Sequence, residues 1–185
     1  YVDTTKDRLY CDSVTSVRRR ATLTAMTIIF KALCRLLAPI LAFTADEAWE
    51  YAGYEGSVHE QDFPAPMPEY DTQEASSVVS RLLEIKSVIQ VAIEEQVKAK
   101  TFSKNNEADI RLTVPSNESE DVVALLEDRA FCTEFFIIAD LSVQTGPELA
   151  ATALRTEHAM CPRCRRYEPE EEGADVCERC SEVLS

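Results

Sequence analysis

Several features that are common in catalytic chains are missing from this 185-residue sequence. Glycine is scarce, with 4 residues, and no Gly-rich phosphate-binding loop occurs. The sequence also lacks a Gly-x-Ser-x-Gly nucleophile motif and a His-Glu-x-x-His metal motif. Its two histidines, His59 and His158, are far apart, and its many carboxylates have no apolar setting that would tune a pair for acid–base work. We therefore predict no catalytic residues in this chain.

Long apolar runs and a secretion signal are missing as well. The longest apolar run, LLAPILAF, is too short to span a bilayer, and the opening YVDTTKDRLY has no apolar leader region. Four of the seven cysteines stand in two close pairs, which leaves Cys11, Cys34 and Cys132. An odd remainder without a secretion signal indicates a reducing compartment. We expect a cytoplasmic protein without membrane contacts, in which Cys34 is a buried free thiol.

Positive charge is in the minority, but it is not evenly spread. The net charge of −14 argues against a nucleic-acid partner when it is taken as a single number. However, residues 1–42 hold seven basic and three acidic side chains, whereas residues 43–80 hold nine acidic and no basic ones. A polyanion could therefore approach the first helices, residues 81–104 and the arginine-rich end of the chain, while acidic surfaces face away.

The strongest motif that is present is CPRCRRYEPEEEGADVCERC, at residues 161–180. Its spacing, C-x2-C-x12-C-x2-C, resembles that of four-cysteine zinc sites, in which two turns complete a tetrahedron of thiolates. The segment has few apolar residues, so zinc binding would have to supply its folding energy. An iron site and a set of disulfide-bonded or idle cysteines are the alternatives. Four thiolate ligands leave no open position for a catalytic water. The predicted ligands are Cys161, Cys164, Cys177 and Cys180.

Helical periodicity dominates the first hundred residues. An apolar stripe indicates a long helix that ends or kinks at Pro39, and its members are Leu23, Met26, Phe30, Leu33, Leu37 and Ile40. FTADEAWEY restarts a helix, with Thr44 and Glu47 in capping-box spacing and Trp49 packed on the first helix. A third helix is marked by Val78, Leu82, Ile85, Ile89 and Ile93.

A mixed pattern follows residue 105. Alternation at Ile110, Leu112 and Val114 predicts a strand, a short helix follows near Val122, and FFIIADLSV resembles a second strand. Residues 149–158 fit either a strand or a short helix. We therefore predict a mainly α fold: a helical bundle, then a small α/β part, then a C-terminal four-cysteine zinc knuckle.

One face of the first long helix carries cations and hydroxyls. Arg20, Thr24, Thr27, Lys31 and Arg35 recur at steps of three and four. Three consecutive arginines, at residues 18–20, lie in the first turn and oppose the helix dipole, which costs about 0.3–1 kcal/mol each without screening. A phosphate partner would relieve that cost, although a merely solvated face explains the periodicity equally well.

Several stretches together resemble the anticodon-binding region of bacterial-type isoleucyl-tRNA synthetases, which are class I enzymes. They are KDRLYC at 6–11, SVRRRATLTA at 16–25, LLAPILAFTADEAWEY at 36–51 and SVHEQDFP at 57–64. MCPRCRRY at 160–167 and VCERC at 176–180 are similar to the zinc-binding C-terminal end of the same enzymes. The middle of the chain matches only loosely, through KAKTFSKNNEADIRL.

The resemblance implies three regions: an N-terminally truncated anticodon-binding region at 1–100, an α/β junction at 101–150 and a zinc-binding tip at 151–185. It also implies a fragment, because the family's H-I-G-H and K-M-S-K-S signatures for ATP are missing. The full-length ligase would join isoleucine to its tRNA with ATP, whereas this fragment alone would be inactive. The implied partners are the anticodon stem-loop of isoleucine tRNA and the catalytic body of the same polypeptide, in a monomer.

The resemblance further implies roles for single residues. Zinc would fix the tip, so that its arginines touch phosphate or an anticodon-loop base, and the first helix would hold the stem through its backbone. The family commonly has Trp where this chain has Arg165, which could hold phosphate or stack by its guanidinium plane. The predicted RNA-binding residues are Arg18, Arg19, Arg20, Lys31, Arg35, Arg163, Arg165 and Arg166.

Two other functions compete with this hypothesis. A zinc-ribbon adaptor that binds a basic protein through its acidic surface predicts no tRNA affinity at moderate salt. A small dithiol redox enzyme predicts an activity that survives zinc removal and a thiol that titrates well below pH 8.

Overall fold

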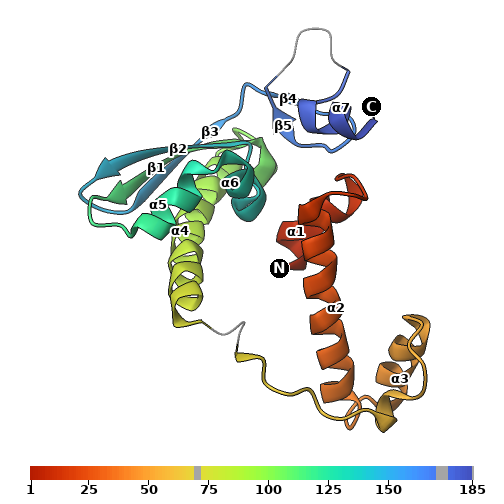
Figure 1. Cartoon of the computed structure of the whole chain (residues 1–185). Coiled ribbons are helices and arrows are strands. Elements are labelled where there is room, and N and C mark those ends of the chain that lie inside the picture. The colour runs from red at the N-terminus through yellow and green to blue at the C-terminus, as the bar shows by residue number, and fades with distance from the viewer. Residues whose placement is uncertain (69–71, 170–174, 185) are drawn as a thin grey trace. The chain divides into compact units, whose positions relative to one another are not determined.

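The computed structural model describes residues 1–68, 72–169 and 175–184 (Figure 1). The chain forms two compact units: unit 1 comprises Tyr1–Asp12 and Thr72–Ser185, and unit 2 comprises Ser13–Asp71. The functional boundaries that we expect at residues 100 and 150 stay a prediction, since the compact units divide the chain elsewhere. Among the described residues, no helix combines the length and the apolar character that crossing a membrane requires.

Unit 2 is a pair of helices with a short return. Helix α2 (Val17–Leu37) begins at Ser16, whose hydroxyl accepts a hydrogen bond from the Arg19 N–H. It ends two residues before Pro39, as the sequence predicts. Helix α3 (Ala42–Tyr51) and the 3-10 turn η1 (Val58–Glu60) follow. Their small shared core confirms the predicted burial of Cys34 and of Trp49, and consists of Cys34, Ala38, Ala45, Trp49 and Val58.

Two local predictions for unit 2 are wrong. The apolar stripe of α2 does not pack as a whole, because Leu33 is 49% exposed and Ile40, beyond the helix end, is 78% exposed. The predicted capping box at Thr44 is not formed: α3 begins at Ala42, and its N-cap residue, Leu41, offers no side-chain acceptor. Thr44 therefore lies inside the first turn of α3, where it cannot act as the N-cap residue, and the Ala45 N–H makes the first bond of the helix, to the Leu41 carbonyl (2.8 Å).

Unit 1 contains one helix from the segment before unit 2 and another that begins directly after it. Helix α1 (Val2–Tyr10) is short, whereas α4 (Gln73–Lys98) is the longest helix described. The Thr72 hydroxyl caps α4 by accepting a hydrogen bond from the Ala75 N–H. As the periodicity predicts, one face of α4 is buried, and it consists of Leu82, Ile85, Ile89, Ala92 and Ile93.

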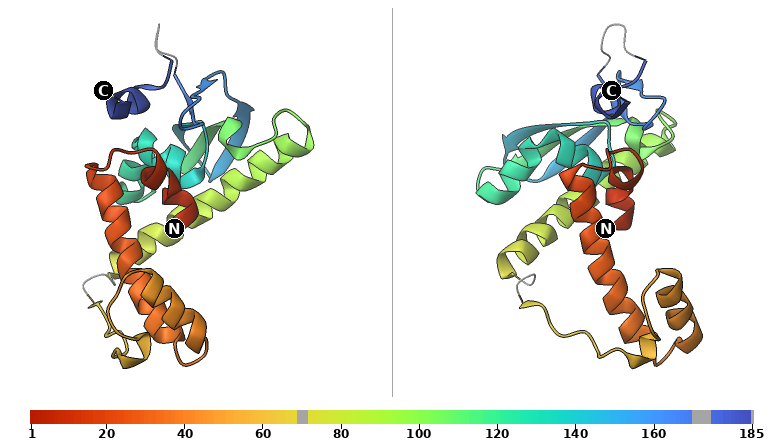
Figure 2. Two further views of the ribbon diagram at one scale, coloured as in Figure 1. Left: turned by 90° about the vertical axis from the view of Figure 1, so that its right-hand side faces the viewer. Right: turned by 45° about the vertical axis from the view of Figure 1, so that its right-hand side comes forward.

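A three-stranded sheet supplies the partner for that face. Its order is β2-β1-β3, with β1 (Ala108–Pro115) parallel to β2 (Asp140–Gly146) and antiparallel to β3 (Ala150–Arg155). Alternate residues of β1 are buried, as predicted for a half-buried strand, while Arg111 on the other face is exposed. Helix α4 lies against one side of this sheet in Figure 1 and in both views of Figure 2.

The crossover from β1 to β2 corrects one strand prediction. It runs through α5 (Glu120–Glu127) and α6 (Arg129–Phe136), so the first half of FFIIADLSV ends a helix and only its second half enters β2. The Asp128 carboxylate caps α6 by accepting a hydrogen bond from the Phe131 N–H, and Phe131 stacks on Phe135 one turn later. The remaining elements are η3 (Asn105–Glu107), β4 (Ala159–Met160), β5 (Tyr167–Glu168) and α7 (Glu178–Leu184).

Candidate metal centre and cationic surfaces

The four knuckle cysteines converge on one point of unit 1. Cys161 and Cys164 lie in the turn between β4 and β5, and Cys177 and Cys180 lie at the start of α7. Their four Sγ atoms all lie within 4.8 Å of one another, and the Cys164 and Cys177 Sγ atoms are 3.7 Å apart. A tetrahedron with Zn–S bonds of about 2.3 Å has edges of about 3.8 Å. The donor set therefore fits a single zinc ion.

Backbone hydrogen bonds shape both knuckles. In the first, the Arg165 N–H donates to the Cys161 carbonyl and the Cys161 N–H donates to the Arg166 carbonyl, both at 2.8 Å. Arg165 takes a left-handed conformation, with φ of 61°, to close this turn. In the second, the Cys180 N–H donates to the Cys177 carbonyl (2.9 Å). These turns aim two thiols each at the same point, which is the geometry that the spacing predicts.

The thiols of this cluster differ in acidity. Burial acts to raise the pKa of Cys161, but the N–H groups of Cys164, Cys177 and Arg163 outweigh it and lower that pKa to about 6. Burial raises the pKa of Cys164 and, to about 11, that of Cys177. Four crowded thiols cannot all ionise without a compensating cation, because their negative charges repel one another at this distance. A thiophilic metal ion would supply that cation.

Three knuckle arginines are bound to the end of helix α1. Arg163 donates from Nη1 to the Cys11 carbonyl (2.9 Å) and to the Cys180 Sγ atom (3.2 Å). Arg166 pairs with the Asp7 carboxylate at 3.1 Å, and Arg179 pairs with the Asp12 carboxylate at 2.7 Å. We call this set the α1 latch, and it consists of Asp7, Cys11, Asp12, Arg163, Arg166 and Arg179.

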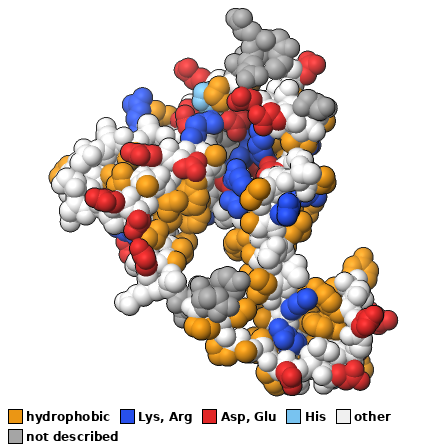
Figure 3. Space-filling model, in the orientation of Figure 1, with side chains coloured by type: hydrophobic (Ala, Val, Ile, Leu, Met, Phe, Trp, Pro, Cys, Tyr) orange, Lys and Arg blue, Asp and Glu red, His pale blue; other side chains and the backbone are white. Residues whose placement is uncertain are grey.

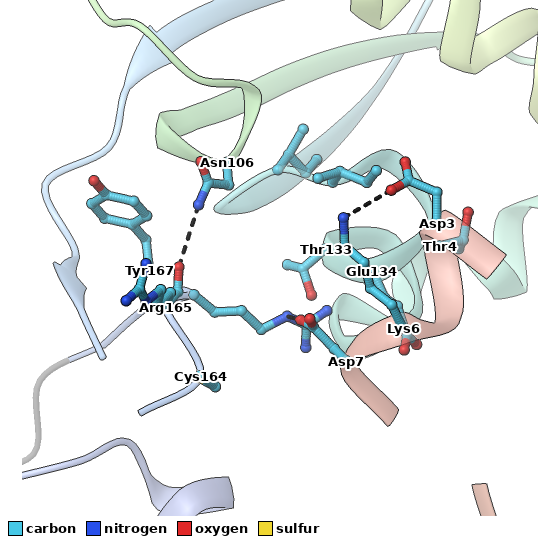
Figure 4. Close-up of a pocket in the computed structure, with 13 residues that line it drawn as sticks. Asp3, Thr4, Lys6, Asp7, Asn106, Thr133, Glu134, Cys164, Arg165 and Tyr167 are labelled. Atoms are coloured by element: carbon cyan, nitrogen blue, oxygen red, sulfur yellow. Dashed lines mark hydrogen bonds and ion pairs between the residues drawn. The ribbon is translucent and has the colours of Figure 1, made fainter. Parts of the chain in front are cut away.

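The three predicted RNA-binding arginines of the tip differ in whether they belong to the α1 latch. Arg163 and Arg166 have partners within the protein, and the Arg166 side chain is only 16% exposed. Arg165 is exposed and lines a cavity of about 380 Å³ together with Lys6, Asn106 and Tyr167. Figure 4 shows Asn106 reaching from the neighbouring loop, with its Nδ2 atom donating to the Arg165 carbonyl at 3.3 Å. Of the three, Arg165 is the one placed to meet a ligand.

The predicted cations of α2 lie on unit 2. Arg18 and Arg20 are exposed, and Arg19 is half-buried. The Lys31 ammonium lies 4.5 Å from the centre of the Tyr54 ring, and the Arg35 Nε atom donates to the Lys31 carbonyl (3.0 Å). All five therefore lie on α2, as predicted, and the contacts of Lys31 and Arg35 lie within the helix or with the return loop.

Some residues around these surfaces carry no signal in the sequence. Asp7 and Asp12 look like ordinary helix-end carboxylates, yet they hold the tip. Tyr54, in the loop after α3, packs on Trp49 with ring centroids 4.6 Å apart and accepts Lys31 on its face. Only their positions in the fold reveal these roles.

Comparison with known proteins agrees with this architecture. Residues 1–112 match the family described as the anticodon-binding domain of tRNA ligase. The whole chain is 30% identical to an isoleucine–tRNA ligase of Methylacidiphilum infernorum, of which it covers 20%. It is 32% identical to isoleucine–tRNA ligase 2 of Burkholderia mallei and to the isoleucine–tRNA ligase of Brevibacillus brevis, covering 19% and 21% of them.

The chain thus spans about one fifth of the length of the curated relatives that it matches. The family match covers all of unit 2, together with α1, α4 and the first part of β1 in unit 1. On this evidence, the chain belongs to the family of anticodon-binding domains of tRNA ligases.

Proposed function

We propose that this chain is the C-terminal, anticodon-recognising part of an isoleucine–tRNA ligase. The observation that carries the proposal is the convergence of four thiols at the end of a chain whose full length aligns with isoleucine–tRNA ligases. The partner is the anticodon stem-loop of isoleucine tRNA. The catalytic body, the ATP and the isoleucine belong to the remaining four fifths of a protein of that kind, which acts as a cytoplasmic monomer.

The cations of α2 hold the stem through its phosphates. Arg18 and Arg20 are exposed in the first turn, where phosphate would offset their repulsion by the helix dipole. Lys31 and Arg35 extend the face of Arg20 by about three to four turns toward the end of the helix. Contacts of this kind supply affinity that falls with salt but no reading of sequence.

The tip holds zinc through Cys161, Cys164, Cys177 and Cys180. When bound, the ion supplies four bonds that fix the two knuckles and leave no position for a reacting water. Arg163 and Arg166 then position the tip on α1, which refines their role from RNA contact to support. Arg165 faces a loop base or a phosphate, beside the Tyr167 ring, and can stack or donate hydrogen bonds.

A titration of the zinc-loaded chain with two RNAs tests this function. We expect measurable binding to isoleucine tRNA at low salt, and weaker binding to the same tRNA with a foreign anticodon, because unstacked loop bases carry the sequence information. Equal affinity for both RNAs would defeat anticodon reading by this chain. Elemental analysis of the same preparation should give one zinc ion per chain, and a metal-free chain with an ordered tip would contradict the zinc assignment.

A further inference from the structure

Many cations in the described part of unit 1 have partners within the unit. Ion pairs join Arg8 to Glu134, Arg81 to Glu118, and Arg129 to Asp140 and Glu168. Lys86 donates to a backbone carbonyl, and the latch arginines bind α1. Within the described part of unit 1, the exposed cations without a carboxylate at ion-pair distance are Lys100, Lys104, Arg111, Arg155 and Arg165.

Four of these five cations lie around the loop between α4 and β1. Arg155, at the end of β3, donates from Nη1 to the Thr101 carbonyl (3.4 Å) and stands opposite Ala108, where that loop enters β1. Asn106 ties the same loop to Arg165 of the first knuckle, as the dashed line in Figure 4 shows. We call this set the loop surface, and it consists of Lys100, Lys104, Arg155 and Arg165. All four side chains belong to exposed residues.

Two members of the loop surface occupy strained backbone positions. Lys100 has φ of 61° and closes α4 by two hydrogen bonds: its own N–H donates to the Val97 carbonyl, and the Thr101 N–H donates to the Gln96 carbonyl, both at 3.0 Å. This is the Schellman arrangement, in which glycine is the usual residue at the left-handed position. Arg165 closes its turn with the same φ of 61°.

Non-glycine residues avoid this conformation, since it costs roughly 1–2 kcal/mol. Among the described residues, those with positive φ other than glycine are Lys100, Ile137 and Arg165, so two of the three are cations of the loop surface. At these two positions glycine would give a more stable fold than lysine or arginine, so stability does not explain the cations. Such an outlier points to a function for the side chain.

The loop between α4 and β1 carries one carboxylate of its own, Glu107, although Asp3, Asp7 and Glu134 line the cavity beside Arg165. Glu107 is buried, 8% exposed, and accepts a hydrogen bond from the Ser103 hydroxyl, while Glu157 is exposed two residues beyond the end of β3. In a chain of net charge −14 this is a local excess of positive charge on unit 1, separate in sequence from the cations of α2. We propose that the loop surface binds the phosphate backbone of the same tRNA, an inference that rests on the proposed function.

A salt titration of tRNA binding tests the loop surface. The double variant Lys100→Gly, Lys104→Gln removes two charges, and glycine at residue 100 relieves the strained backbone, so folding should be preserved. If each lysine contacts one phosphate, the slope of log K against log salt falls by about 1.5 in magnitude, and affinity at 100 mM salt falls about tenfold or more. Thermal unfolding of the variant should be unchanged or shifted upward.

Arg111→Gln is the matched control, because Arg111 is an exposed, unpaired cation of the same unit on the open face of the sheet. It should leave the slope of the salt titration unchanged. If the wild-type chain binds tRNA but the double variant has the same slope, the inference is overturned and the surface is left for an acidic protein partner. If the wild-type chain binds no tRNA even at low salt, the proposed function itself fails.

Discussion

Helices α4 and α2 are both long and amphipathic, yet the two units bury them very differently. In unit 1, α4 packs five apolar residues into a core that also takes in β1, α5 and α6. In unit 2, α2 buries only Thr22 and Cys34. Figure 3 shows hydrophobic side chains on the surface of unit 2, and those of α2 include Leu23, Ile29, Leu33, Leu36 and Leu37. Periodicity thus identifies a helix, but a partner layer decides whether its stripe becomes a core.

We expect the largest effect from the loss of one metal ligand, which should disorder the tip but leave the core of unit 1 folded. Cys180→Ser removes a ligand that is 0% exposed, and we expect the loss of stoichiometric zinc together with fast amide hydrogen exchange in residues 160–169 and 175–184. Protection of α4 should remain. Elemental analysis and hydrogen exchange are the measurements, and Cys34→Ser, at a buried cysteine of unit 2, is the control. Retention of one zinc ion by Cys180→Ser would refute the four-thiolate site.

The next prediction compares the apolar stripe of α4 with that of α2. Ile89→Ala should lower the free energy of unfolding by about 2–5 kcal/mol, because Ile89 is 0% exposed and its loss leaves a cavity. Leu33→Ala should change it by about 0.5 kcal/mol or less, since Leu33 is 49% exposed. Urea unfolding, followed separately by probes in each unit, measures both. Equal losses would contradict the contrast between the units.

A smaller effect tests the α1 latch. Arg163→Gln removes the hydrogen bonds to the Cys180 Sγ atom and the Cys11 carbonyl, and groups that support metal ligands in this way typically contribute 10–100-fold to metal affinity. Competition with a chromophoric chelator gives the zinc affinity. Arg165→Gln is the matched control: it loses the same charge in the same turn without a latch contact. Equal zinc affinities for the two variants would rule out the supporting role of Arg163.

The smallest effect concerns pH and the pair that joins α4 to the start of α5. Hydrogen bonding from Arg81 holds the pKa of Glu118 below its usual 4.5. The stabilisation is therefore complete above pH 4.5 and is lost as the pH falls through the lowered value. Glu118→Gln should flatten the pH dependence of unfolding in this acidic range, by about 1 kcal/mol or less. Glu84→Gln, at an exposed partner of the same arginine, should change it less, and a larger change there would reverse the assignment.

Features set by short spacings were predictable from the sequence. The buried face of α4, the alternation in β1 and the four-cysteine cluster all follow from residues at most a few turns apart, or from motif spacing. The helical conformation of Phe135 and Phe136, the first two residues of FFIIADLSV, was not predictable from propensity, since aromatic and β-branched residues favour strands. A cap at Asp128 and the stacking of Phe131 on Phe135 make α6 the better solution.

The roles of the tip arginines depend on partners that sequence analysis cannot see. Arg163, Arg165 and Arg166 look equivalent in the motif, but two of them meet residues of α1 that lie more than 150 positions earlier. Likewise, Lys100 reads as an ordinary charged residue until its backbone conformation is known. Long-range contacts and backbone conformation, rather than residue type, distinguish these residues in the structure.

The α1 latch also has a consequence for how the chain is made. Cys11 precedes its partner Arg163 by 152 residues, and Asp12 precedes Arg179 by 167. At a synthesis rate of about 5–20 residues per second, α1 leaves the ribosome roughly 10–30 s before the arginines that hold it. Contacts of α1 with α6, such as the pair of Arg8 with Glu134, can form earlier, so the latch is among the last contacts of unit 1 to form.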